Sequence, residues 1–281
     1  DSATVVATTA VREARNRYVF IDSILRKTGL SIEVLTVGDV IYYIDSYLSY
    51  QLKKQYPIRE KNVLIVELGS GSLDISVMKK GFTLFNVGLP IGTLRIGQLI
   101  NRLDGSIEEN YEAVREYIEK EFTCLNNIMP TVRVDDIILL DENYSQYVAN
   151  ILPDVCQEGK FFPLSLKDSE QLISNIYDKS PEEIEREYDI PSEIAETFIP
   201  YSIILNLLLH TTLTKSRHLY VLETSLTEAV LANILMRPAI SKKYDKSNQL
   251  VSVARFLCEK FNADLKHAEH VALLAEKLFE S

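Results

Sequence analysis

The most constraining feature of this sequence is a glycine turn between two apolar runs, within residues 63–77 (VLIVELGSGSLDISV). The run before the turn and the alternating run after it are typical of two β-strands joined by a tight turn. Gly69 and Gly71 allow backbone conformations in which amide N–H groups approach an anion closely. Ser70 and Ser72 add hydroxyl donors. The turn is therefore a candidate phosphate-binding loop, and an ordinary hairpin with small turn residues is the alternative.

Two carboxylates flank this turn. Glu67 lies just before it and Asp74 lies just after it. A phosphate-bound divalent cation takes oxygen ligands, and this pair stands where such ligands are needed. Glu67 also follows a run of buried-strand residues, where a carboxylate needs a partner. The pair is therefore a candidate metal site.

Composition narrows the class of partner. Thirty basic and forty acidic residues give the 281-residue chain a net charge of -10, which argues against a surface for nucleic acid or for anionic membranes. The most apolar helix candidate, residues 202–213, is too short to span a bilayer and suits a core helix. Cys124, Cys156 and Cys258 lack metal-ligand spacing, so we expect buried cysteines in a reducing cytoplasm.

Hydrophobic periodicity predicts alternating strands and helices, which is typical of an α/β fold. Strands are expected at residues 4–8, 32–36, 82–87, 136–140 and 218–223, and on both sides of the glycine turn. Helices are expected at residues 12–28, 40–55, 95–103, 107–125, 144–152, 168–213 and 226–236, and from residue 242 onward. The polar stretch 54–61, which contains a proline, predicts a domain boundary.

Three segments resemble consecutive motifs of one enzyme family. Residues 7–14 (ATTAVREA) resemble Ala-Thr-Ser-Ala-(Val/Leu)-Arg-Glu-Ala of the exopolyphosphatase and guanosine pentaphosphate phosphatase family. Residues 63–75 resemble its second phosphate loop, and residues 89–95 (LPIGTLR) resemble the Leu-Pro-Leu-Gly-Ala-Val-Arg that follows. Residues 222–231 and 267–279 resemble two later segments, the second of which opens a helical domain.

This resemblance implies an actin-like (ribonuclease H-like) two-lobed α/β fold, followed by the start of an all-α domain. Residues 1–58 would form the C-terminal part of lobe one, residues 59–236 lobe two, and residues 237–281 the beginning of the helical domain. The family's first phosphate loop, Asp-x-Gly-(Ser/Thr)-x-Ser, has no counterpart in the 281 residues. We therefore expect the rest of lobe one and of the helical domain to lie outside them.

The resemblance also implies an activity: release of the terminal phosphate from inorganic polyphosphate or from guanosine pentaphosphate, with Mg²⁺. The family's glutamate motif Ser-Gly-x-Glu-Glu-Ala reads TVGDVI at residues 36–41, and the Gly-Gly-Thr expected after residues 136–140 reads DENYS. An aspartate, shorter by one methylene, reaches less far toward an attacking water. A non-catalytic binder of nucleotide or polyphosphate is therefore the alternative. A lobe used mainly to form a homodimer is a third option.

Roles for single residues follow from the resemblance. The amides and hydroxyls of Gly69–Ser72 would hold a terminal phosphate, with the Thr9 hydroxyl as a further donor. Glu67 and Asp74 would bind or orient Mg²⁺, and Glu67 would also serve catalysis. Arg12 would contact a phosphoryl oxygen, and Asp39 would steer the attacking water. The alternatives are a surface helix charge for Arg12, a helix N-cap for Asp39 and a helix cap for Thr9.

A polyphosphate chain would also need a track of positive charge. The basic residues that could supply it are Lys79, Lys80, Arg95, Arg102, Lys215 and Arg217. Scattered, solvated side chains are the alternative for each.

Overall fold

A computed structural model of the chain describes residues 3–155, 160–210, 218–236, 240 and 244–279. Its strands are β1 (Val5–Ala7), β2 (Ile32–Val34), β3 (Asn62–Leu68), β4 (Leu73–Lys79), β5 (Phe82–Leu89), β6 (Asp136–Leu140), β7 (Phe161–Ser165) and β8 (His218–Leu222). Its helices up to residue 151 are α1 (Thr9–Arg12), α2 (Arg17–Thr28), α3 (Val37–Gln51), α4 (Thr93–Ile100), α5 (Ile107–Ile128) and α6 (Ser145–Ile151), with a 3₁₀ turn at Leu52–Lys54. The later helices are α7 (Leu166–Ile176), α8 (Pro181–Tyr188), α9 (Ser192–His210), α10 (Leu226–Leu235), α12 (Lys246–Lys260) and α13 (Leu265–Phe279).

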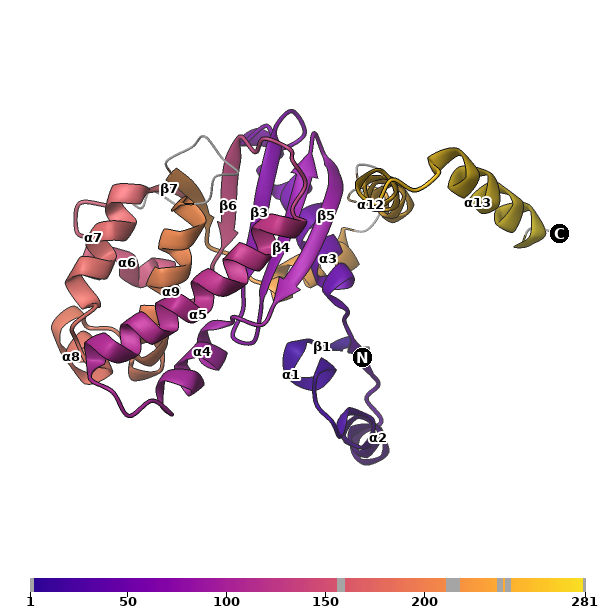
Figure 1. Cartoon of the computed structure of the whole chain (residues 1–281). Helices are drawn as coiled ribbons and strands as arrows, with labels where there is room; N and C mark the ends of the chain where they lie inside the picture. Colours follow the sequence, from indigo (N-terminus) through magenta and orange to yellow (C-terminus); the bar gives the residue numbers. More distant parts are fainter. Residues whose placement is uncertain (1–2, 156–159, 211–217, 237–239, 241–243, 280–281) are drawn as a thin grey trace.

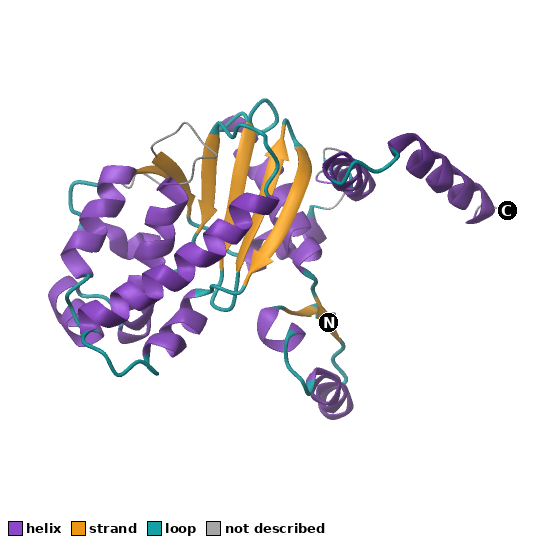
Figure 2. Cartoon of the chain, in the orientation of Figure 1, coloured by secondary structure: helices purple, strands orange, loops and turns teal. Residues whose placement is uncertain are grey.

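Six strands form one mixed sheet in the order β5-β4-β3-β6-β8-β7 (Figure 2). Strands β3, β4 and β5 form an antiparallel meander, while β6 runs parallel to β3 and β8 runs parallel to β6. Strand β7 pairs antiparallel with β8 at the edge. Strands β1 and β2 form a separate parallel pair.

Helices cover both faces of the six-stranded sheet. Because side chains alternate along a strand, Leu64 and Val66 of β3 join the core on the side of α5 and α9. Val63 and Ile65 join the core on the side of α3 and α10. Figure 1 shows α5 crossing one face, with α3 behind the sheet. The result is a three-layer α/β/α arrangement.

Helix α3 belongs to the core of the large sheet. Its residues Val40, Ile44 and Leu48 follow the spacing of one helix face and are buried against that sheet. The chain that enters α3 comes from the small β1–β2 unit, so α3 connects the two parts. The predicted boundary at residue 58 follows this helix and remains a prediction.

The N-terminal unit lies beside the end of the large sheet where β3 turns into β4 (Figure 1). Helix α2 ends as the sequence predicts: Gly29 has φ +74° and donates its N–H to the Leu25 carbonyl. The single helix expected over residues 12–28 is instead two helices, α1 and α2, because a non-helical segment separates Arg12 from Arg17.

The C-terminal helix α12 packs against β5. The rings of Phe256 and Phe85 meet edge to face at 6.1 Å, and the Gln249 side chain bonds the Thr83 amide at 2.8 Å. Helix α13 buries no residue and extends away from the sheet (Figure 1).

Three expectations from the sequence need correction. Strand β7 was not expected; it contains Pro163, which an edge strand tolerates because the missing N–H costs no ladder bond. Within residues 168–213, expected to be wholly helical, the described part forms α7, α8 and α9, and α8 starts at the cap residue Ser180. The apolar helix expected over residues 202–213 starts earlier than predicted: α9 begins at Ser192 and is long and apolar enough to span a membrane, although 67% of its apolar stretch is buried inside the structure. Cys124 is exposed, because it lies off the buried stripe of α5. Cys258 is half-exposed on α12, whose described part buries only Gln249, and Cys156 lies outside the described residues.

Candidate functional site

The β3–β4 turn presents backbone amides that have no partner in the described structure. Gly69 donates its N–H to the Ser72 carbonyl at 3.0 Å, which closes the turn. Among the described residues, none accepts a hydrogen bond from the amides of Ser70, Gly71 or Ser72. Three neighbouring donors are therefore available to an anion, which is the property that the glycine turn predicts.

The start of α4 holds this loop in place. The Thr93 amide donates to the Gly69 carbonyl and the Arg95 amide donates to the Ser70 carbonyl, both at 3.2 Å. A Cβ on Gly92 would lie 2.4 Å from the Gly71 nitrogen, so only glycine permits this approach. The carbonyls of Gly69 and Ser70 are thus bonded to α4, while the amides of Ser70, Gly71 and Ser72 keep no partner among the described residues.

Glu67 and Asp74 lie directly opposite each other on β3 and β4. Opposite residues on antiparallel strands bring their Cβ atoms to about 5 Å, so the two carboxylates share one face of the sheet. Burial, the Asp74 charge and the Glu142 charge raise the pKa of Glu67 to about 8, against the opposing charge of Arg12. Burial also raises the pKa of Asp74 to about 6. A positive charge placed beside the pair would therefore stabilise its ionised form.

Asp74 has an unsatisfied oxygen. Its side chain is 3% exposed, and its Oδ1 atom is buried without a hydrogen-bond partner in the described structure. Gly88, opposite Asp74 on β5, makes room for it, because a Cβ there would lie 2.5 Å from Oδ1. A buried carboxylate oxygen without a donor points to a ligand that the chain itself does not supply.

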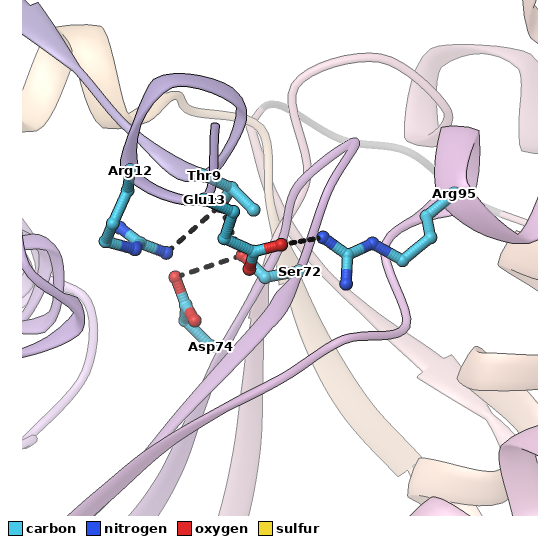
Figure 3. Close-up of polar contacts among 6 residues, drawn as sticks. All are labelled: Thr9, Arg12, Glu13, Ser72, Asp74 and Arg95. Atoms are coloured by element: carbon cyan, nitrogen blue, oxygen red, sulfur yellow. Dashed lines mark hydrogen bonds and ion pairs between the residues drawn. The ribbon is translucent and has the colours of Figure 1, made fainter. Parts of the chain in front are cut away.

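The N-terminal unit contributes two side chains to the same place, as Figure 3 shows. The hydroxyls of Thr9 and Ser72 lie 3.0 Å apart, and the Ser72 hydroxyl lies 3.5 Å from Asp74 Oδ2. Arg12 donates from Nη2 to the Thr9 hydroxyl at 3.1 Å and from Nη1 to the Leu35 carbonyl at 2.9 Å. Thr9 and Arg12 therefore do not have the capping and surface roles that were their alternatives.

A family model matches the N-terminal half of the chain, where this site lies. The family model of the Ppx/GppA phosphatase family matches residues 1–140, which contain the loop, both carboxylates and Arg12. The chain belongs to this family. No curated protein sequence matches the chain significantly.

Solved structures of the family share the fold. A family member from Aquifex aeolicus is 22% identical, with a TM-score of 0.67 over 84% of this chain and 74% of that protein. An exopolyphosphatase from Cytophaga hutchinsonii is 20% identical, with a TM-score of 0.67 over 83% of this chain and 75% of that one. The actin-like two-lobed fold expected from the sequence is confirmed.

Asp39, at the position of the family's glutamate motif, is bonded elsewhere. Its carboxylate accepts from the Thr36 amide at 3.1 Å and the Thr36 hydroxyl at 2.7 Å, forming a capping box in which Thr36 is the N-cap. Lys246 of α12 bonds its other oxygen at 3.1 Å. Burial would raise the pKa of Asp39, but these bonds and the Lys246 charge lower it. Within the described structure, no hydrogen bond joins Asp39 to the loop or to the Glu67–Asp74 pair.

The segment that replaces the family's Gly-Gly-Thr supports the loop indirectly. Asp141 is buried, which raises its pKa, and its Oδ1 accepts the amides of Asn143 and Tyr144 at 3.0 and 2.9 Å. The Tyr144 hydroxyl bonds the Thr93 hydroxyl at 2.8 Å, at the start of the helix that holds the loop. Glu142 is exposed between them.

A metal would find two protein carboxylates here. Among the described residues, no group of three or more His, Cys, Asp or Glu side chains converges to hold an ion. Glu67 and the unsatisfied oxygen of Asp74 fit a cation that takes its remaining ligands from water and phosphate, as Mg²⁺ commonly does.

The basic residues do not form one track. Lys79 and Lys80 lie at the far end of β4 from the loop, about 20 Å away at the rise of a strand. Arg95 lies next to the loop, where it pairs with Glu13. Lys215 and Arg217 lie outside the described residues.

Sequence reasoning gave no role to Glu13, Gly88, Gly92 or Glu142. The two glycines did carry a signal, because they stand at and just before the family-like segment 89–95. Glu13 and Glu142 also stand in segments compared with the family, 7–14 and 141–145, but only the fold shows that both lie near the loop.

Proposed function

We propose that the protein hydrolyses the terminal phosphoanhydride bond of inorganic polyphosphate or of guanosine pentaphosphate, with Mg²⁺. Membership of the Ppx/GppA phosphatase family supports phosphatase-type chemistry in general. One observation carries the narrower proposal: three loop amides without a partner among the described residues lie beside half-buried Glu67 and buried Asp74, which has an unsatisfied oxygen. Together they offer donors for a phosphate and oxygen ligands for its cation.

Enzymes that transfer phosphoryl groups act mainly by positioning the substrate and by stabilising charge on the transferring group. In this proposal the amides of Ser70–Ser72 hold the terminal phosphate. Arg12 faces the same space and offsets charge on an equatorial or leaving oxygen. The Thr9 and Ser72 hydroxyls, now bonded to each other, turn toward the phosphate when it enters.

The carboxylate pair would hold Mg²⁺ between the loop and Arg12. When bound, the ion supplies positive charge next to the phosphoryl oxygens. Glu67 and Asp74 need such a charge, because their raised pKa values report that the ionised forms are poorly compensated. Once ionised, Glu67 is also the carboxylate best placed to orient a water toward the loop.

A role for Asp39 in steering water stays a prediction. It requires the Asp39 carboxylate to leave both Thr36 and Lys246. This engagement favours the second candidate function, a non-catalytic binder of polyphosphate or nucleotide with the same loop.

The test is release of orthophosphate by the purified protein from polyphosphate and, separately, from guanosine pentaphosphate, with Mg²⁺. Glu67→Gln keeps the size of the side chain and removes its charge, and we expect the rate to fall by about 100-fold or more. The matched control is Arg115→Gln, which removes one partner of an exposed pair with Glu119 on α5 and should leave the rate unchanged. Background release by the unmodified protein, together with measurable polyphosphate binding, would support the binder instead.

A further inference from the structure

One ion pair connects the N-terminal unit to the element that holds the loop. Arg95 Nη2, from the first turn of α4, lies 2.5 Å from Glu13 Oε2, at the end of α1 (Figure 3). The two residues are 82 positions apart in sequence. Their side chains are 34% and 51% exposed, so solvent and solutes reach the pair.

The backbone of Arg95 fixes its side chain relative to the loop. The Arg95 amide bonds the Ser70 carbonyl, whose residue provides one of the unbonded amides. The Arg95 backbone is therefore one hydrogen bond away from the proposed phosphate site, within reach of its own side chain. In the described structure it contacts Glu13 through Nη2 alone, which leaves its remaining donors for another partner.

The carboxylates near the loop outnumber Arg12, so a second positively charged side chain would stabilise a bound polyanion there. Glu67 and Asp74 lie opposite each other beside the loop, and the charges of Asp74 and Glu142 both act on Glu67. Arg12 uses one donor of Nη1 for the Leu35 carbonyl and one of Nη2 for the Thr9 hydroxyl, which leaves its other N–H groups for the terminal phosphate. Arg95 is such a side chain: it belongs to the ion pair with Glu13 that lies at the loop in the described structure.

We propose that Arg95 binds the second phosphate of a linear polyphosphate, the one next to the terminal phosphate on the loop amides, and that Glu13 occupies Arg95 until substrate arrives. This inference rests on the proposed function. A phosphate offers the planar guanidinium two oxygens in parallel and more charge than a single carboxylate oxygen. A polyanion therefore displaces Glu13, and the ion pair between the two units opens as the substrate binds.

If Glu13 and the substrate compete for Arg95, removing Glu13 and removing Arg95 change the KM in opposite directions. A purely structural ion pair does not predict this. Removing the Glu13 charge frees Arg95, so Glu13→Gln should lower the KM for tripolyphosphate by about two- to fivefold, the range expected for an exposed pair. Arg95→Gln should raise this KM by about tenfold or more, because a charged hydrogen bond to substrate is lost. Arg95→Lys should recover part of the loss, since it keeps the charge without the paired donors.

The experiment measures kcat and KM for tripolyphosphate and the inhibition constant of orthophosphate, for wild type and the three variants. Orthophosphate occupies the loop alone, so its inhibition constant should stay within about twofold in every variant. The control Arg115→Gln should change nothing, and circular dichroism melting should show that all proteins are folded.

An Arg95→Gln variant that weakens orthophosphate as much as tripolyphosphate would overturn the assignment, as would a Glu13→Gln variant with unchanged or higher KM. Absence of turnover in the wild type would overturn the proposed function and this inference together. If the wild type turns over tripolyphosphate and the variants have the same KM as the wild type, the inference alone would be overturned.

Discussion

Asp45 and Asp74 are buried carboxylates on the same side of the large sheet, with half-buried Glu67 opposite Asp74, and the structure satisfies their oxygens differently. Asp45, on α3, is fully buried, and its two oxygens accept hydrogen bonds from the hydroxyls of Ser76 and Thr83 at 2.9 and 2.8 Å. The Tyr244 hydroxyl adds a third donor at 3.3 Å. Asp74, two residues before Ser76 on the same face of β4, keeps one oxygen without a partner.

A raised pKa alone does not distinguish a structural carboxylate from a binding site. Burial raises the pKa of Asp45 and of Asp74 alike, each to about 6, so the shift does not separate them. The unsatisfied oxygen and the neighbouring unbonded amides do. We interpret Asp45 as a structural acceptor that ties α3 to β4 and β5, and the Glu67–Asp74 pair as a site that is completed by a ligand.

Replacing Asp45 should cost the most stability. Asp45→Ala removes the buried acceptor of three hydroxyls, on Ser76, Thr83 and Tyr244, of which Thr83 and Tyr244 can still bond each other. We expect about 3 kcal/mol of destabilisation in urea unfolding at pH 5. Asp74→Ala removes a poorly compensated charge beside Glu67 and should cost about 1 kcal/mol or less. Equal losses for the two variants would contradict the comparison.

The pH dependence sharpens this prediction. The folded-state pKa of Asp45, about 6, lies above its ordinary value of 3.8, so folding favours its protonated form. Wild-type stability due to this group is complete below about pH 4 and is lost as the pH rises toward 6. The deficit of Asp45→Asn relative to wild type should therefore shrink between pH 4 and pH 6 and stay constant above it.

The second prediction concerns the loop backbone. In Gly92→Ala the new methyl would meet Gly71 backbone atoms at 2.4 Å, so we expect a loss of about 2 kcal/mol in unfolding free energy and weaker phosphate binding, measured by calorimetry. The matched control is Gly38→Ala in the first turn of α3, where the new methyl meets only the Thr36 hydroxyl at 3.7 Å. That change should be neutral or stabilising by a few tenths of a kcal/mol. An unperturbed Gly92→Ala variant would show that the loop tolerates displacement.

The third prediction couples cation binding to protons. The pKa of Glu67, about 8, leaves this carboxylate mostly protonated at pH 7, so a bound cation must displace its proton. Mg²⁺ affinity should then rise by up to about tenfold per pH unit below pH 8 and level off above it. Calorimetry in buffers of different ionisation enthalpy would count about one proton released at pH 7 and fewer at pH 9. In Glu67→Gln the rise between pH 7 and pH 8 should vanish, and a rise that persists would assign the proton to another group.

The sequence predicts the local parts of this site and misses the distant ones. The turn between β3 and β4 follows from its glycines and from two apolar runs, and the register of a tight hairpin then places Glu67 opposite Asp74. No local pattern reveals the Glu13–Arg95 pair or the hydroxyls around Asp45, because those contacts join residues 31 to 199 positions apart. Strand β7 was missed because Pro163 weakens a strand pattern that only its edge position makes acceptable.

Asp39 shows a different limit of sequence reasoning. The motif placed it at an acidic position of the family, and the local sequence also allowed a helix cap. The structure supports capping, with Thr36 as the N-cap and Asp39 three residues later in a capping box. Capping the helix and orienting the attacking water predict different outcomes when Asp39 is replaced. A substitution of Asp39 therefore tests whether the site includes the start of α3.

We expect Asp39→Ala to lower stability by about 1 kcal/mol and to change phosphate release by less than about threefold. The loss has a structural cause, because the Thr36 amide and hydroxyl and the Lys246 ammonium each lose an acceptor. Glu109→Ala is the matched control, since Glu109 holds the same place in the capping box of α5 with Ser106 as the N-cap. Urea unfolding should give similar losses for both variants. A 100-fold fall in phosphate release confined to Asp39→Ala would instead mean that this carboxylate leaves its cap to reach the water, and the site would then extend from the loop to the start of α3.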